Sequence, residues 1–182
     1  MIRLGFVLLA TLLLAGCQEE VQIAKPAAIK LTPESAGHYC QMTVLEHDGP
    51  KAQIHLAGFP FPLWFTQVRD AVAFKLSPEE TDKIAAIYVN DMDKAESWDQ
   101  PGFDNWIDAD NAWFVTGSRQ AGGMGAPEVI PFGTEAGALN FAEEHGGSVL
   151  RLAEVPESYV FAPVEISAAV DLLKPDTDKG QP

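Results

Sequence analysis

Residues 112–154 read AWFVTGSRQAGGMGAPEVIPFGTEAGALNFAEEHGGSVLRLAE, and they predict one complete folding unit. The opening AWFVTGS and the later PEVIPF are typical of strands, and the glycine-rich RQAGGMGA between them indicates a turn. TEAGALNFAEEHGG predicts a helix in which Thr134 is the N-cap and Gly146 ends the helix. SVLRLAE predicts a further strand. The predicted order is therefore strand, strand, helix, strand.

An earlier segment, residues 39–90, repeats this order without repeating the sequence. YCQMTVLEH over 39–47 and KAQIHLAG over 51–58 predict two strands joined by a DGP turn. PFPLWFTQVRDAVAFK over 60–75 has apolar residues at helical spacing, with prolines near the predicted start. KIAAIYVN over 83–90 predicts a buried strand. The fold class is therefore predicted as α+β, with two similar ββαβ units packed together.

The organisation of the whole chain of 182 residues follows from these two units. We predict a signal peptide, a lipidated and flexible tether, a first ββαβ unit, a linker, a second ββαβ unit and a tail. In chain order these parts are residues 1–16, 17–36, 37–95, 96–110, 111–163 and 164–182. A short helix is expected at EISAAVDLL in the tail. The formal net charge of −14 argues against nucleic acid and against adsorption on anionic lipid.

The N-terminus, MIRLGFVLLATLLLAGCQEE, is typical of a secretory signal. One basic residue and an apolar run precede small residues and Cys17, and the run is too short for a spanning helix. The pattern resembles a bacterial lipoprotein signal, in which the cysteine becomes the first mature residue and carries lipid. We therefore expect lipidation at Cys17 and an anchor in a bacterial membrane facing the periplasm, where Gln18 favours the outer membrane. An ordinary signal peptide with an incidental cysteine is the alternative.

Cys40 is left without an intramolecular partner if Cys17 carries lipid. Thiols outside the cytoplasm usually form disulfides, so an unpaired one indicates a reactive thiol, an intermolecular bridge or a ligand. Cys40 and Met42 share one face of the predicted strand, and Met124 lies in the glycine-rich turn of the second unit. Soft thiolate and thioether donors select Cu(I), whereas a structural zinc site usually has close cysteine pairs. The competing interpretation is that these side chains only fill the core.

Several long blocks of the sequence resemble the NosL family of accessory lipoproteins for nitrous oxide reductase assembly. They are GHYCQMTVLEHDGPKAQIHLAG, PLWFTQVRDAVAF, IAAIYVNDM, WIDADNAWFV and GGMGAPEVIPF, between about residues 36 and 162. The resemblance implies two ββαβ units similar to parts of organomercurial lyase. It also implies a Cu(I) chaperone, with no catalytic role, that delivers copper for the reductase's copper centres. The implied partners are the reductase and an ATP-driven membrane assembly complex with a periplasmic partner protein.

The resemblance also assigns residues. The family's Cys-x-Met matches Cys40 and Met42, and its glycine-flanked methionine matches Met124. The family often has glycine between the cysteine and the methionine, whereas this chain has Gln41. On a strand the Gln41 side chain would point away from the sulfur atoms, so we expect copper binding to survive this departure.

Histidines are the remaining candidate donors. His38 precedes Cys40 by two residues and shares the sulfur face of the predicted strand, so it is a candidate nitrogen ligand for copper. His47 and His55 are predicted as cross-strand neighbours on an acidic surface, and His145 is expected to interact with a helix C-terminus. Either of the first two is a weaker candidate ligand than His38.

A thiol enzyme is the alternative function. Cys40 would be its nucleophile, with His38 or His55 as the base, and the implied likeness to the lyase fold supports it. A nucleophilic cysteine needs a lowered pKa and a positioned base. Lys30 is the only cationic side chain of Lys or Arg type within ten residues of Cys40, so the local sequence offers little to stabilise a thiolate except a metal. A structural lipoprotein with a buried thiol is the third interpretation.

Overall fold

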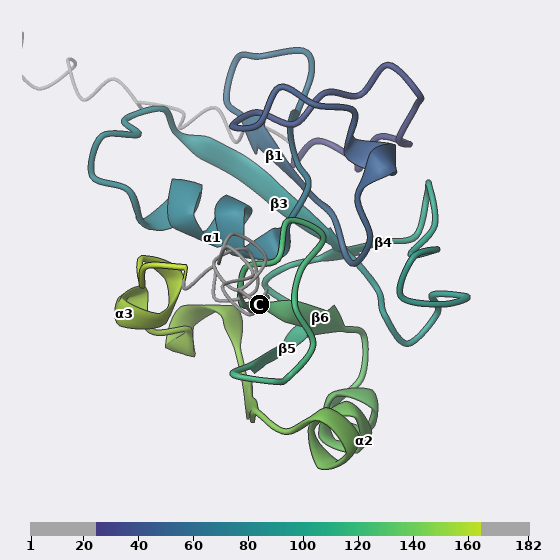
Figure 1. The fold of residues 1–182 in the computed structure, drawn as a ribbon. Helices are drawn as coiled ribbons and strands as arrows, with labels where there is room; N and C mark the ends of the chain where they lie inside the picture. Colours follow the sequence, from purple (N-terminus) through teal and green to yellow (C-terminus); the bar gives the residue numbers. More distant parts are fainter. Residues whose placement is uncertain (1–24, 165–182) are drawn as a thin grey trace, which may run out of the picture.

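The computed structural model describes residues 25–164, which form two antiparallel sheets with three α-helices (Figure 1). The signal peptide, Cys17 and the predicted helix in the tail lie outside the described residues. No helix within residues 25–164 is both long and apolar enough to span a bilayer. The mixed α+β class with two packed ββαβ units is confirmed.

The first sheet is built around β1, which spans Ala52–Leu56 and is buried along its whole length. β1 pairs with β2 (Leu63–Phe65) on one side and with β3 (Ile84–Asn90) on the other. β4 (Trp106–Asp108) adds to β3, which gives the order β2-β1-β3-β4. Helix α1 (Val68–Leu76) connects β2 to β3. Strand, strand, helix and strand therefore follow each other as expected.

The second sheet has three strands in the order β6-β5-β7. They span Trp113–Thr116 for β5, Ile130–Phe132 for β6 and Ser148–Leu150 for β7. Helix α2 (Glu135–His145) connects β6 to β7 along the chain and packs on this sheet (Figure 1). The predicted caps are confirmed, because the Thr134 hydroxyl accepts the Gly137 N–H at 3.0 Å and Gly146 follows the helix with φ of 77°.

Two predictions in the first unit are wrong. Residues 39–47 form no strand; they form a turn followed by a short 3-10 helix over Val44–Glu46. Residues 63–65 are strand β2 rather than helix, and α1 begins only at Val68. Pro60 and Pro62 favour extended backbone before them, so the apolar residues that follow pair with β1 instead of starting the helix. KAQIHLAG is consequently the first strand of the unit, not the second.

One apolar core joins the two units. Its buried members come from β1, β2, α1 and β3 of the first unit, and also from the second unit and the C-terminal segment. Phe114 of β5 is fully buried in this core together with Val129, and Leu152, Val155 and Val160 close it near α1. Helix α3 (Glu157–Val160) packs beside α1, as Figure 1 shows. The two sheets are therefore held in one relative position by buried surface.

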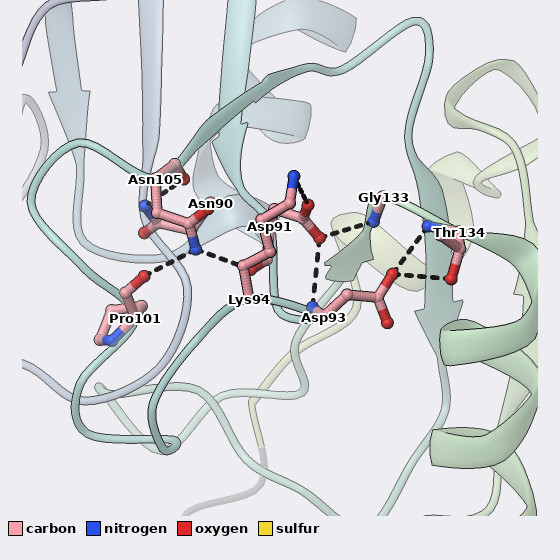
Figure 2. A network of polar contacts seen from close by, with 8 residues as sticks. All are labelled: Asn90, Asp91, Asp93, Lys94, Pro101, Asn105, Gly133 and Thr134. Atoms are coloured by element: carbon pink, nitrogen blue, oxygen red, sulfur yellow. Dashed lines mark hydrogen bonds and ion pairs between the residues drawn. The ribbon is translucent and has the colours of Figure 1, made fainter.

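The segment that follows β3 ties the two sheets together, and Asn105 of the predicted linker supports it (Figure 2). The carboxylate of Asp91, which is 1% exposed, accepts the Gly133 N–H at 2.7 Å. The carboxylate of Asp93 accepts both the backbone N–H and the hydroxyl of Thr134, at 2.7 and 2.9 Å. Asn105 donates to the Asp91 carbonyl at 2.7 Å. These bonds connect the end of β3 to the start of α2.

The N-terminal segment packs against the first sheet. Residues 25–36, which the sequence analysis assigns to a tether, lie against β1, β3 and the linker. Ile29 exchanges two hydrogen bonds with the buried amide of Gln53, at 2.8 and 2.9 Å. Tyr88 donates to the Pro26 carbonyl at 2.7 Å, and Leu31 is 2% exposed. Residues 25–36 are therefore part of the folded body.

Candidate functional site: a sulfur cluster between the units

Cys40 lies in a closed turn rather than on a strand. The Gly37 N–H donates to the Met42 carbonyl at 2.9 Å, and the Gln41 N–H donates back to the Gly37 carbonyl at 2.9 Å. The thiol folds over Gly37, since a Cβ on that glycine would lie 2.6 Å from Cys40 Sγ. Any side chain at position 37 would therefore displace the sulfur.

Gln41 has a φ of 57°, in the left-handed region that favours glycine. Its side chain turns back onto the loop and donates to the His38 carbonyl at 2.6 Å. This geometry gives a physical reason why a glycine would suit the position between the cysteine and the methionine. In this chain the side-chain hydrogen bond compensates for the unfavourable backbone conformation.

Met124 is presented by a tight turn of the second unit. Within that turn the Gly125 N–H donates to the Gly122 carbonyl at 2.8 Å. The turn packs on the 47–49 loop of the first unit so closely that a Cβ on Gly123 would lie 2.3 Å from the Asp48 carbonyl oxygen. The Met124 N–H donates to the buried side-chain carbonyl of Gln67 at 3.0 Å. Packing and this hydrogen bond therefore fix where the thioether begins.

The thiol of Cys40 and the thioether of Met124 meet at one hydroxyl. Thr66, at the end of β2, is 2% exposed. Its Oγ1 lies 3.9 Å from Cys40 Sγ and donates a hydrogen bond to Met124 Sδ at 3.3 Å. The two sulfur atoms come from different ββαβ units, so the candidate site lies where those units meet. Sequence reasoning did not single out Thr66, because a threonine after a strand carries no signal of its own.

Met42 and His38 are placed differently from each other. Met42 belongs to the same turn as Cys40, and its side chain is 42% exposed. The His38 ring instead packs between aromatic side chains, with ring centroids 5.7 Å from Phe65 and 5.5 Å from Phe74. The strand that would have put His38 on the sulfur face does not exist. In this structure the imidazole is therefore part of an aromatic cluster.

Two buried titratable side chains, Lys51 and Glu128, support the loops of the site. Lys51 is 1% exposed, and its ammonium donates to the carbonyls of His47, Asp48 and Gly49 at 2.5, 2.9 and 2.7 Å. Burial lowers the pKa of Lys51 to about 8, although the charge of Glu128 opposes the shift. The ammonium thus holds together the loop on which the Met124 turn rests.

Glu128 is the second buried titratable side chain, and it is 1% exposed. Its Oε1 accepts the backbone N–H groups of Arg69 and Val129, both at 2.8 Å, while Oε2 has no hydrogen-bond partner. Burial raises the pKa of Glu128 to about 8 in spite of these two donors. A Cβ on Gly122 would lie 2.7 Å from Oε2, so this carboxyl directly supports the glycine-rich turn.

The other histidines make different contacts. His55 is 3% exposed and bonds Gln53 Oε1 at 2.8 Å, so its predicted place on an acidic surface is wrong. His145, in the last turn of α2, stacks on Phe141 with centroids 4.3 Å apart. The backbone carbonyl of His47 accepts a hydrogen bond from the Lys51 ammonium. Within residues 25–164 no three His, Cys, Asp or Glu side chains are grouped so that they could hold a metal.

Comparison with known proteins places the chain in a family. The NosL family model matches residues 28–160. The copper-binding lipoprotein NosL of Achromobacter cycloclastes is 53% identical over 167 residues, covering 90% of this chain and 86% of that protein. The copper-binding lipoprotein NosL of Stutzerimonas stutzeri is 35% identical over 158 residues, covering 83% and 80%.

Comparison with a solved structure supports the same family. The crystal structure of the copper chaperone NosL from Shewanella denitrificans matches with a TM-score of 0.68 and 31% sequence identity. The match covers 74% of this chain and 98% of that one. The chain therefore belongs to the NosL family.

Proposed function

We propose that this protein is a lipid-anchored Cu(I) chaperone that hands copper on for assembly of the copper centres of nitrous oxide reductase. The observation that carries the proposal is the meeting of Cys40 Sγ and Met124 Sδ at the Thr66 hydroxyl. A thiolate and thioethers are soft donors, which favour Cu(I) over magnesium, calcium and manganese. The copper-binding names of the relatives from Achromobacter cycloclastes and Stutzerimonas stutzeri support this reading.

The proposed ligands are Cys40, Met42 and Met124, with His38 as a nitrogen ligand that joins on loading. Met42 and Met124 are 42% and 44% exposed, so an ion held by them stays accessible to a partner. A site of few, exposed soft ligands suits a carrier, which must release its ion as well as bind it. The ion is cargo in this proposal, and the protein itself catalyses no reaction.

Delivery requires an anchor and partners. We propose that Cys17 carries lipid and holds the protein on a bacterial membrane, facing the periplasm, with the outer membrane favoured. The lipoprotein names of the curated relatives support the anchor. The resemblance supports the reductase and its ATP-driven membrane assembly complex as partners. The net charge of −14 favours a cationic ligand over nucleic acid.

A thiol enzyme is less well supported by the geometry. Of its two candidate bases, His55 is buried beside Gln53, and His38 packs between Phe65 and Phe74. A base within hydrogen-bond reach of the nucleophile is the first requirement of such chemistry. The contact found at Cys40 Sγ is instead the Thr66 hydroxyl.

Titration with Cu(I) against a competing chelator tests the proposal, using the mature chain with Cys17→Ser. We expect one tightly bound ion. Cys40→Ser should lower the affinity by a factor of about a hundred or more, and Met42→Leu and Met124→Leu by about tenfold each. Met92→Leu is the matched control, because Met92 packs against the apolar cluster of the second unit. Absence of Cu(I) binding by the unmodified chain would refute the proposal.

Transfer is tested by mixing the copper-loaded chain with copper-free nitrous oxide reductase and its assembly complex. We expect copper to move to the reductase only when the loaded chain retains Cys40. Equal copper uptake from the Cys40→Ser protein would show that delivery does not pass through this site. Turnover of an organomercurial by the copper-free protein would instead favour the thiol enzyme.

A further inference from the structure

Thr66 is a buried hydroxyl whose only side-chain hydrogen-bonding contacts within residues 25–164 are to sulfur. It lies 2% exposed at the end of β2, next to Gln67, which holds the backbone of the Met124 turn. Its Oγ1 contacts Cys40 Sγ at 3.9 Å and Met124 Sδ at 3.3 Å. A buried hydroxyl normally bonds nitrogen or oxygen, which are stronger partners than a neutral sulfur. This arrangement therefore calls for a functional reason.

The directions of the two hydrogen bonds follow from the inventory of donors. A thioether has no proton, so the Thr66 hydroxyl must donate to Met124. A hydroxyl has one proton and two lone pairs, so towards Cys40 the same oxygen accepts. The metal-free protein thus has a relay that runs from the Cys40 S–H to Thr66 Oγ1 and from the Thr66 O–H to Met124 Sδ.

Copper loading removes the Cys40 S–H proton with which this relay begins. Binding of Cu(I) by Cys40 replaces the thiol proton, which passes to water, and leaves a thiolate that only accepts hydrogen bonds. Met124 must at the same time turn its sulfur lone pair to the ion. The hydroxyl proton then has a better acceptor in the thiolate, because hydrogen bonds to charged groups are about twice as strong as neutral ones.

We propose that Thr66 is a positioning residue that orders Met124 in the metal-free protein and turns its O–H to the Cys40 thiolate when copper binds. The reversal needs rotation about one C–O bond and no movement of the backbone. It releases the thioether at the moment when the thiolate forms. The inference rests on the proposed function, since it assigns Thr66 a role in the same copper site.

Thr66→Val tests the inference, because valine keeps the branched shape and removes the hydroxyl. In the mature chain with Cys17→Ser, we expect the Cu(I) affinity to fall by about tenfold and the release rate to rise. Thr66→Ser restores the hydroxyl and should return the affinity to within a few-fold of the parent value. Thr43→Val is the matched control, because Thr43 follows Met42 in the Cys40 loop and its side chain makes no capping hydrogen bond.

A second measurement follows the mobility of the methionine methyl groups in the metal-free protein. With ¹³C-methyl methionine, Thr66→Val should make the Met124 methyl more mobile, while the methyls of Met42 and Met92 stay unchanged as internal references. Parent affinity together with an unchanged Met124 methyl in Thr66→Val would overturn the inference and leave the chaperone proposal intact. Failure of the parent protein to bind Cu(I) would overturn both.

Discussion

His38 lies two residues from Cys40 in the sequence, but its side chain packs in an aromatic cluster. Its backbone N–H is fixed to the Trp64 carbonyl at 2.7 Å, and its ring lies against Phe65 and Phe74. Rotation of the His38 side chain, without any backbone movement, would take the ring out of its contacts with Phe65 and Phe74. The gain from a fourth ligand is therefore reduced by the loss of aromatic contact.

We expect His38→Phe to weaken Cu(I) binding, but by less than Cys40→Ser, about tenfold at most. Phenylalanine keeps an aromatic ring in the cluster and removes the nitrogen donor, so the fold should be retained. Chelator competition measures the affinity, and X-ray absorption of the loaded protein reports whether a nitrogen ligand has been lost. An affinity equal to that of the parent protein would exclude His38 from the site.

At the residue scale, the candidate sulfur donors could be named from the sequence, and the structure brings two of them, Cys40 and Met124, to one hydroxyl. A cysteine without a partner, a methionine two residues later and a methionine among glycines are visible as letters. Thr66 could not be found in this way, since its contacts with the two sulfur atoms depend on where β2 ends in space. The reason offered for His38 failed because it assumed a strand where Gly37 and Gln41 form a turn.

Elements matter to the site chiefly through the Met124 turn. This turn has no core of its own, and its position depends on contact with the 47–49 loop and on the Gln67 hydrogen bond. In the sequence, the flanking glycines indicate only a turn. The structure shows a different use, because Gly123 lets two backbones approach more closely than any side chain would permit.

Gly123→Ala should therefore displace the turn and lower the Cu(I) affinity by about tenfold or more, since the added Cβ would overlap the Asp48 carbonyl. Gly125→Asn is the control in the same turn. A Cβ there meets nothing within 4 Å, and asparagine tolerates the φ of 78° better than other residues. Chelator competition on both variants provides the comparison. Equal affinities would show that the close approach at Gly123 does not position the thioether.

Prediction of elements succeeded where the pattern was local. The helix of the second unit has its cap and its stop within the chain of 134–146, and both are confirmed. It failed at 60–67, where apolar spacing favoured a helix and pairing with β1 produced a strand. Strand pairing is a tertiary interaction, and it overrides the helical spacing of only a few residues.

At the scale of the whole molecule, two buried titratable side chains, Glu128 and Lys51, make stability depend on pH. The raised pKa of Glu128, about 8 against an ordinary 4.5, means that the folded protein keeps a proton that the unfolded chain has lost between these values. Folding stability contributed by this group is therefore present at low pH and is lost as the pH rises towards 8. Lys51 has the opposite effect, because its pKa is lower in the folded protein than in the unfolded chain. Above pH 8 the folded protein releases a proton that the unfolded chain still holds, so the contribution of Lys51 to stability rises with pH.

We expect the free energy of unfolding to fall from pH 5 to pH 8, with a slope that approaches about 1.4 kcal/mol per pH unit. Glu128→Gln should remove most of this slope, because the amide keeps the acceptor Oε1 and does not titrate. Denaturant unfolding at several pH values measures it. Glu144→Gln, the same change on an exposed helix residue, is the control and should keep the parent slope. A Glu128→Gln protein with the parent slope would contradict the assignment.

Packing of residues 25–36 on the first sheet has a consequence for where the protein can work. If Cys17 carries the lipid, only eight chain steps separate the acyl group from Lys25, and a fully extended peptide of that length spans about 28 Å at most. The folded body is then held close to the membrane that carries the lipid and cannot cross a wide gap to another membrane. An acceptor would have to come within that reach of the bilayer to collect the ion.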